Sequence, residues 1–189
     1  MFSKKNRVYM DDKYAVRDLQ KIIYNQIKSE YHLYKNLIIL CIGTDRSTGD
    51  SLGPLTGTIL KKNKYLPVNI YGTIDDPVHA NNLDQSIKNI NKKYIRPYII
   101  AIDAGLGKKT SVGCVDVKDG PLKPGTGVNK TLTHVGNMHI TGLVNVSGYM
   151  EYLVLQSTRL SIVMKMAEII AGGLEASIRM INREKTAID

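Results

Sequence analysis

Two aspartates stand where a parallel α/β sheet collects its functional groups. Asp50 comes shortly before a helix-forming segment at 52–62, and Asp103 closes the apolar strand segment 98–103. If 98–103 lies beside the apolar segment 37–42, both carboxylates reach the same edge of the sheet. Two carboxyl groups at close range cannot both ionise cheaply, so one of them keeps a proton near neutral pH. The ionised member can then activate a water molecule while the protonated member polarises a carbonyl, which predicts acid–base catalysis.

The two aspartates are expected to differ in charge. A helix N-terminus beside Asp50 favours its ionised form, so we expect Asp103 to carry the proton. The spacing leaves another interpretation open, because Asp is also common as a helix cap and as a turn residue after a strand. On that interpretation the two residues have structural roles and form no catalytic pair.

Two glycine-containing loops give weaker signals for nucleotide binding. The loop from Gly43 to Gly49 has five residues between its glycines instead of the four of a P-loop, and Asp50 stands where the phosphate-binding lysine belongs. An acidic residue at that position would repel a phosphate, so we reject nucleotide hydrolysis. The segment Gly105-Leu106-Gly107 lacks the third glycine of a dinucleotide-binding fingerprint.

Histidine and cysteine add little support for a metal site or a nucleophile. His134 and His139 are five residues apart, a spacing that does not fit ligation from consecutive turns of one helix. Cys41 lies within an apolar strand segment and is expected to be an inert buried thiol, and Cys114 is too distant in sequence to suggest a thiolate pair. No histidine is obviously placed to activate Ser51, so a serine triad is not supported.

Length and composition predict a single globular domain. The chain has 189 residues, of which 43% are hydrophobic and 23% charged, and this is enough to bury one core. It lacks an apolar run long enough to span a membrane, and its polar N-terminus lacks the apolar stretch of a secretory signal, so we expect a cytoplasmic protein with no membrane partner. The net charge is +9, and residues 61–109 hold nine Lys or Arg against four Asp. With no Trp, one Phe and no basic–aromatic repeat, nucleic acid is not the expected partner.

The order of predicted elements favours helices packed on both faces of a parallel sheet. Helices and strands alternate as helix 12–29, strand 37–42, helix 52–62, strand 68–72, helix 81–92 and strand 98–103. Strands 37–42 and 98–103 are apolar throughout, which is typical of strands buried on both faces. We therefore predict a three-layer α/β/α sandwich with a mostly parallel central sheet, in which these two strands are neighbours.

The rest of the chain is predicted to belong to the same single domain, 1–189. Its expected parts are a helical N-terminal extension at 1–36, a strand at 112–117, a Gly/Pro-rich loop at 119–127, a strand or buried irregular segment at 138–146, and a long helix at 157–182 with a bend at Gly172–Gly173. No internal repeat and no linker divides the chain.

Two motifs around the aspartates resemble those of a known protease family. The segments 41–54 and 100–104 resemble the two acidic motifs of the bacterial spore germination protease. A longer match, to the YyaC-type sporulation family related to that protease, extends through the segments 122–127, 139–146 and 155–160. These segments span the chain from about 37 to 175, and residues 1–36 gain nothing from the resemblance.

The resemblance implies a fold and an activity. The germination protease shares its fold with the hydrogenase maturation proteases and is regarded as an atypical aspartic protease that cleaves small acid-soluble spore proteins. Carried over residue by residue, it implies that Asp50 and Asp103 are the acidic pair of a sporulation or germination peptidase. The implied partner is a protein or peptide substrate, with small acid-soluble spore proteins as candidates, in the cytoplasm of a spore or sporulating cell. A homo-oligomer is compatible with the sequence.

Two departures from these families bear on cofactors and activity. Hydrogenase maturation proteases use a Glu, an Asp and a His around a metal, and the expected place of the His reads Ser157-Thr158-Arg159 here. A guanidinium there would repel a divalent cation, so we expect no metal and no other cofactor. We expect Arg159 to hold a substrate carboxylate instead, with Thr44, Ser51 and Gly105 as further substrate-binding residues. The chain is also much shorter than the germination protease, so elements that recognise substrate there are not all expected here. Two alternatives stay open: a non-catalytic binding or regulatory protein on a protease-like fold, and a basic protein that binds nucleic acid in the spore.

Overall fold

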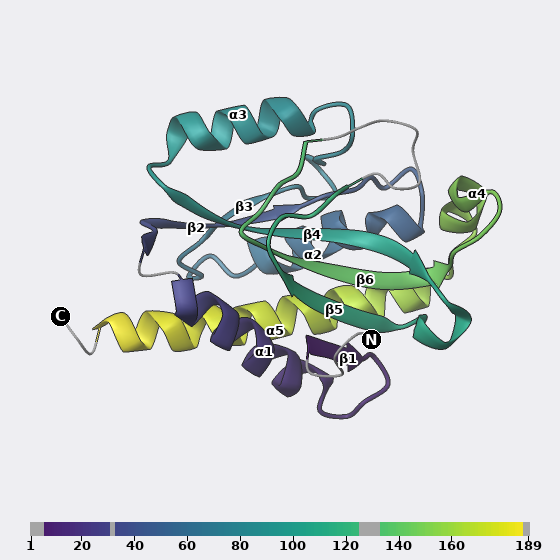
Figure 1. Cartoon of the computed structure of the whole chain (residues 1–189), viewed down its shortest axis with the longest axis horizontal. Helices are drawn as coiled ribbons and strands as arrows, with labels where there is room; N and C mark the ends of the chain where they lie inside the picture. Colours follow the sequence, from purple (N-terminus) through teal and green to yellow (C-terminus); the bar gives the residue numbers. More distant parts are fainter. Residues whose placement is uncertain (1–5, 31–32, 125–132, 187–189) are drawn as a thin grey trace.

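The computed structural model describes residues 6–30, 33–124 and 133–186, which form a six-stranded sheet with helices on both faces (Figure 1). The strand order is β1-β5-β6-β4-β2-β3, with β1 at Arg7–Tyr9, β2 at Asn36–Cys41, β3 at Asn69–Tyr71, β4 at Pro97–Gly107, β5 at Cys114–Asp119 and β6 at Met138–Val146. The pairs β6–β4, β4–β2 and β2–β3 are parallel, whereas β5 is antiparallel to both of its neighbours. The predicted fold class is confirmed, and the two apolar strands are neighbours as predicted.

The paired segments of the central strands, 37–41 of β2 and 98–102 of β4, are apolar because both faces of the sheet are covered there. In β2, alternate side chains enter two separate hydrophobic clusters: Leu37, Ile39 and Cys41 enter the first, and Ile38 and Leu40 enter the second. The side chains of β4 alternate between the same two clusters. A strand of this kind has no polar face, which explains its uninterrupted apolar sequence.

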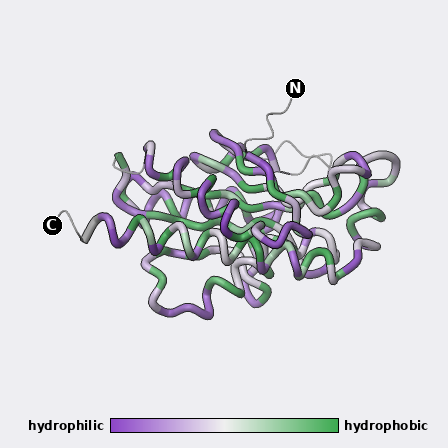
Figure 2. The backbone as a smooth tube through the Cα atoms, turned by 90° about the horizontal axis from the view of Figure 1, so that it is seen from below, coloured by the Kyte–Doolittle hydropathy of each residue, from purple (hydrophilic) through white to green (hydrophobic). Residues whose placement is uncertain are grey.

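Among the helices that the structure describes, three cover one face of the sheet and one covers the other. Helices α1 (Ala15–Glu30), α2 (Leu52–Lys61) and α5 (Leu160–Thr186) pack on the first cluster, and α3 (Leu83–Lys93) lies on the opposite face (Figure 1). Figure 2, which looks from the side of α1 and α5, shows hydrophobic and hydrophilic stretches alternating along these helices, as amphipathic packing requires. Within the described ranges, no helix is long and apolar enough to cross a membrane.

The paired glycines of α5 serve helix packing. The helix continues through Gly172 and Gly173, where a bend was predicted, and α1 approaches it there. A Cβ on Gly173 would lie 2.9 Å from Leu19 Cγ, and one on Gly172 would lie 3.2 Å from Val16 Cγ1. The absent side chains therefore let the two helices pack closely.

The N-terminal segment contributes to the core and to the sheet. The predicted helical extension at 1–36 also contains a strand, because Arg7–Tyr9 pairs with β5 as strand β1. A strand of three residues is too short to show a period in the sequence. Of the residues on α1, Leu19, Ile23 and Ile27 are fully buried in the main cluster. Residues 6–30 are therefore built into the domain.

The strand that carries Asp103 is longer than predicted. Its pairing with β2 ends at Ile102, whereas its pairing with β6 continues to Gly107. Asp103 is thus the first residue of β4 beyond the end of β2, and it lies within the strand, opposite Thr141 of β6. Because β6 supports the far half of β4, the strand extends beyond its apolar run.

The remaining differences concern the second half of the chain. Residues 138–146 form the regular strand β6, the predicted helix 157–182 begins at Leu160, and a separate short helix, α4, occupies Glu151–Gln156. Part of the predicted loop 119–127 and of the matching segment 122–127, namely residues 125–127, lies outside the described residues.

Candidate active site

A cavity of about 800 Å³ opens at the carboxyl edge of β2 and β4, where the sequence predicted the two aspartates to meet. Its walls come from the loop after β2, the loop before α3, the far half of β4, and α4. The charged or titratable side chains that line it are Asp45, Arg46, Asp50, His79, Asp103, Glu151 and Tyr152. Both aspartates of the predicted pair therefore belong to one cavity.

A sharp turn after β2 places Asp50 in this cavity. Gly43 has a φ of +138°, and a Cβ on it would lie 2.0 Å from the backbone oxygen of Asp50, so only glycine fits there. The backbone N–H of Thr44 donates to that same oxygen at 3.2 Å. Asp50 lies in a short 3-10 helix, Gly49–Ser51, that leads directly into α2, so the positive end of that helix lies beside its carboxylate.

The two carboxyl groups differ in their electrostatics. Burial raises the pKa of Asp103 well above its ordinary value, and the negative charge of Asp50 raises it further, against an opposing hydrogen bond from the Ala104 backbone N–H. Burial also raises the pKa of Asp50, but the Thr44 backbone N–H and the positive charge of His79 oppose that rise. Asp50 is therefore the member that ionises first as the pH rises, and Asp103 is the member that keeps its proton.

His79 is a further titratable residue of the cavity for which the sequence pattern carries no signal. The preceding residue, Val78, forms a parallel β-bridge with the residue after β2, and this holds His79 beside the loop of Asp50. The Nδ1 atom of His79 accepts the backbone N–H of Asn81 at 3.3 Å, and its own backbone N–H donates to Asn82 Oδ1 at 2.8 Å. In the neutral ring the proton then lies on Nε2, which leaves Nε2 to donate to a ligand or to water.

Helix α4 supplies a wall that the sequence did not predict. Its residues Tyr152 and Leu155 line the cavity from one face of the helix. Leu155 packs on Gly49, where a Cβ would lie 2.8 Å from Leu155 Cδ2. A six-residue helix gives too short a pattern to recognise in a sequence. Its place depends on the absent side chain of Gly49, next to Asp50.

Two of the four residues predicted to bind substrate line the cavity and two do not. Thr44 and Gly105 are among the lining residues. Ser51 is buried, and its hydroxyl donates to the Thr48 carbonyl at 2.6 Å, so it stabilises the turn of Asp50. Arg159 is exposed immediately before α5 and is not among the lining residues. The structure therefore gives no support to the expectation that Ser51 and Arg159 contact substrate.

The cavity does not offer the ligands of a metal site. Within the part of the chain that the structure describes, no three His, Cys, Asp or Glu side chains are grouped so as to hold a metal ion. His134 is exposed, His139 Nδ1 donates to the Gly120 carbonyl at 2.9 Å, and neither histidine lines the cavity. The donor set thus does not fit the metal of hydrogenase maturation proteases. Metal independence stays a prediction.

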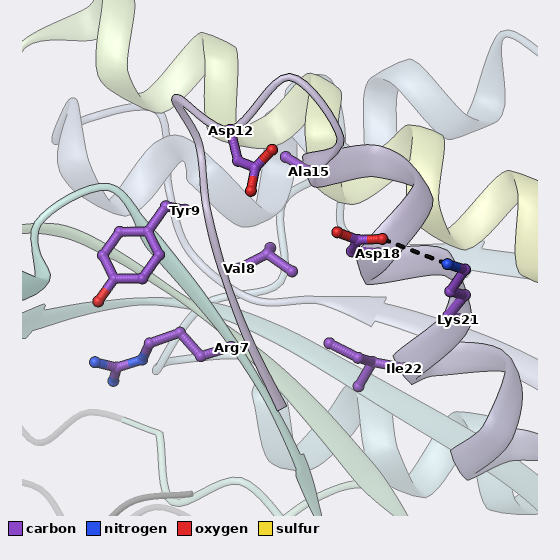
Figure 3. Close-up of a pocket in the computed structure, with 8 residues that line it drawn as sticks. All are labelled: Arg7, Val8, Tyr9, Asp12, Ala15, Asp18, Lys21 and Ile22. Atoms are coloured by element: carbon purple, nitrogen blue, oxygen red, sulfur yellow. Dashed lines mark ion pairs between the residues drawn. The ribbon is translucent and has the colours of Figure 1, made fainter. Parts of the chain in front are cut away.

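A second cavity, of about 330 Å³, lies between β1 and α1 (Figure 3). Val8 points from β1 toward α1, whereas Arg7 and Tyr9 point to the other side of the strand (Figure 3). The Arg7 guanidinium already donates to both carboxylate oxygens of Asp116, at 2.5 and 2.6 Å. Strands β5 and β6 separate this cavity from β4, and the described residues that line it include no His or Cys.

The chain is similar in sequence to a protein family and to a bacterial protein. The family described as "Protein of unknown function (DUF1256)" matches residues 7–173. A protein of Bacillus subtilis (strain 168), described as "Uncharacterized protein YyaC", is 48% identical over 183 residues, which cover 95% of this chain and 88% of that protein. Both matches reach into the N-terminal segment, which corrects the expectation that residues 1–36 lie outside the resemblance.

A solved structure shares the fold. The NiFe hydrogenase maturation protease HycI from Thermococcus kodakarensis KOD1 is similar with a TM-score of 0.54, covering 84% of this chain and 99% of that chain. The two sequences are 14% identical, so the likeness concerns the fold alone. It agrees with the predicted relation to the hydrogenase maturation protease fold.

Proposed function

The chain belongs to the family described as "Protein of unknown function (DUF1256)", and we propose that it is a peptidase in which Asp50 and Asp103 activate water against a peptide bond. The observation that carries the proposal is the pair itself: two carboxyl groups in one cavity, with the charge of one raising the pKa of the other. The protease fold of HycI supports the same kind of activity, and so do the motifs that resemble those of the spore germination protease.

The pKa order assigns a role to each carboxyl group. The ionised Asp50 takes a proton from a water molecule, and the resulting oxygen attacks the carbonyl carbon of the substrate. The protonated Asp103 donates its proton to the carbonyl oxygen as the tetrahedral intermediate forms. When the C–N bond breaks, Asp50 gives its proton to the leaving amine, and Asp103 takes its proton back from the new carboxyl product. Atoms and charges balance, and the pair returns to its starting state.

The surroundings of the pair support this division of roles. The N-terminus of α2 lies beside Asp50 and stabilises its negative charge. His79 lines the same cavity, and its positive charge acts on Asp50 in the same direction. No comparable positive group is among the causes that shift Asp103, whose carboxyl is governed by burial and by Asp50. The asymmetry keeps one acid and one base available together.

Small acid-soluble spore proteins are the first substrates to test, because the motifs of the acidic pair resemble those of a protease that cleaves them. The purified chain is incubated with an acid-soluble protein extract of spores, and intact-mass analysis detects new fragments. We expect cleavage by the native protein and a loss on the order of 10²-fold or more in rate for Asp50→Asn and for Asp103→Asn.

Two results would overturn the proposal. Cleavage retained in both Asn variants would point to another site or to a contaminating protease. No cleavage by any form, together with binding of spore proteins that survives both substitutions, would favour a non-catalytic binding or regulatory protein. Circular dichroism of each variant establishes that a loss of activity does not come from unfolding.

A further inference from the structure

Helix α4 places apolar side chains directly beside the acidic pair. A Cβ on Gly49, the residue before Asp50, would lie 2.8 Å from Leu155 Cδ2 and 2.9 Å from the Leu155 carbonyl oxygen. Tyr152, one turn earlier on α4, lines the cavity together with Leu155. A ligand that reaches the carboxylates therefore has an apolar wall next to it.

Hydrogen bonds hold this wall in place. Asn145 of β6 donates from Nδ2 to the Val154 carbonyl at 3.2 Å and to Thr158 Oγ1 at 3.1 Å. The Thr158 hydroxyl in turn donates to the Val154 carbonyl at 2.8 Å. Within α4, Gln156 Nε2 donates to the Tyr152 hydroxyl at 3.0 Å. The two bonds from Asn145 connect the C-terminal part of α4 and the residue Thr158 to β6, and the other two are local to α4, so its apolar side chains are positioned before a substrate binds.

The rest of the lining favours an apolar group over an acidic one. Apolar residues also come from the loop before α3 and from β4, namely Ile74, Pro77 and Leu106. Among the described residues that line the cavity, the basic ones are Arg46 and His79, against four acids: Asp45, Asp50, Glu151 and the protonated Asp103. With three acids free to ionise against two basic residues, a substrate carboxylate near the pair would meet more negative than positive charge. Arg159 is not among the residues that line the cavity.

We propose that the preferred substrate carries a large apolar side chain, such as Leu, Met or Phe, next to the peptide bond that is hydrolysed, and that Tyr152 and Leu155 determine this preference. The inference rests on the proposed peptidase function and names the substrate class of the same site. Removing such a side chain from water favours binding, and apolar pockets discriminate between side chains by roughly 10- to 200-fold.

The same region continues the apolar surface outside the cavity. Tyr149 is 89% exposed, Met150 56% and Leu153 48%, all within or next to α4. These side chains offer further apolar contact to a protein segment that extends from the cavity along α4. We therefore expect a longer substrate to bind more tightly than a short peptide with the same cleavage site.

A peptide library tests the preference. The probe is a quenched-fluorescence decapeptide library with randomised central positions, and mass spectrometry identifies the residues that flank each cut. We expect Leu, Met and Phe to be enriched next to the cleaved bond, and Asp and Glu to be depleted. For a matched pair of library peptides with Leu or Ala at that position, kcat/KM should differ on the order of tenfold or more.

Two variants test the wall itself. Tyr152→Ala alters an exposed side chain and leaves the core intact, and Leu155→Ala removes the contact with Gly49. Each should reduce the Leu-to-Ala ratio of kcat/KM, mainly through KM for the Leu peptide. Tyr65→Ala is the matched control, since Tyr65 is 91% exposed and lies between α2 and β3, away from the cavity lining. An unchanged ratio in both α4 variants would overturn the proposal.

Binding separates this inference from the proposed function. The same library is retained on immobilised Asp50→Asn protein, and the bound peptides are sequenced. Apolar enrichment among peptides bound to Asp50→Asn, without cleavage by the native protein, would support the subsite and refute the peptidase. Cleavage by the native protein without apolar preference would support the peptidase and refute the apolar subsite. Bound peptides without apolar enrichment would overturn the subsite whatever the activity.

Discussion

The negative charge of Asp50 raises the pKa of Asp103, whose burial already disfavours the charged form. The two residues come from different elements: Asp50 precedes α2, and Asp103 belongs to β4 just beyond its pairing with β2. Their coupling links the proposed chemistry to the stability of the fold. The buried carboxyl of Asp103 loses its proton less readily in the folded protein than in the unfolded chain. The free energy of unfolding therefore decreases as the pH rises.

Replacing Asp103 with Asn is expected to stabilise the fold toward neutral pH. The pKa of Asp103 is higher in the folded protein than in the unfolded chain, so the unfolded chain loses this proton first as the pH rises. The free energy of unfolding of the native protein should therefore fall above the ordinary carboxyl range, about pH 4, up to the raised pKa of Asp103. Asp103→Asn lacks this titration.

Urea unfolding of the native protein and of Asp103→Asn, between about pH 4 and pH 8, measures the difference. Asp45→Asn is the control, because Asp45 is an exposed aspartate of the same cavity. If the stability of Asp103→Asn followed the same pH dependence as that of the native protein, the raised pKa of Asp103 would be refuted.

His79→Asn is expected to move the acid limb of the pH–rate profile to higher pH. Positive charge on His79 lowers the pKa of Asp50, so a neutral Asn lets that pKa rise. The carboxylate that activates water is then formed only at higher pH. The measurement is kcat/KM against pH on acid-soluble spore proteins. His139→Asn is the matched control, since His139 donates to the Gly120 carbonyl away from the cavity lining. An acid limb in the same place would assign His79 no influence on Asp50.

The central part of the fold could be predicted because its physical signals are local. The segments 37–41 of β2 and 98–102 of β4 are buried on both faces, so these segments are apolar without interruption. β1 has three residues and α4 has six, and both are too short to show a period. Each is placed by contacts that are distant in sequence: β1 by its pairing with β5, and α4 by its packing on Gly49.

Only those residues of the site whose position depends on the ends of the central strands could be predicted from the sequence. Asp50 follows β2, and Asp103 follows the part of β4 that pairs with β2, so their convergence follows from the sheet order. His79 reaches the cavity because Val78 forms a β-bridge with Ile42. A single bridge leaves no periodic pattern of apolar residues in the sequence, so this position could not be predicted. Arg159 was assigned by its position in a family motif, but the side chain at that helix start is exposed and does not line the cavity.

Treatment with a chelator is expected to leave peptidase activity intact. Zinc sites in proteins commonly use three or four ligands that include His or Cys, and no group of three such side chains is formed by the residues that the structure describes. Activity on acid-soluble spore proteins is measured before and after dialysis against EDTA, with a chelator-sensitive metalloprotease as the control. Loss of activity that returns on adding zinc, nickel or manganese would contradict the prediction and would assign a metal to the site.

Gly43→Ala is expected to reduce both stability and activity. Gly43 has a φ of +138°, and a Cβ on it would collide with the backbone oxygen of Asp50 at 2.0 Å, so the turn that carries Asp50 must move. Backbone strain of this kind costs about 1–3 kcal/mol. A displacement of about 1 Å at a reacting group can cost on the order of 10²-fold in rate.

Gly120→Ala is a control that has the backbone strain of Gly43→Ala without its steric collision with Asp50. Gly120 also has a positive φ, +82°, but a Cβ there would meet no atom of the described residues within 4 Å. Both variants should therefore unfold at lower urea concentration than the native protein, because alanine is strained at a positive φ in either place. Only Gly43→Ala should also lose kcat/KM on acid-soluble spore proteins, since only there does the new methyl group displace Asp50. If Gly43→Ala kept its kcat/KM, the proposed activity would not depend on where this turn holds Asp50, and the carboxylate would lose its role as the base.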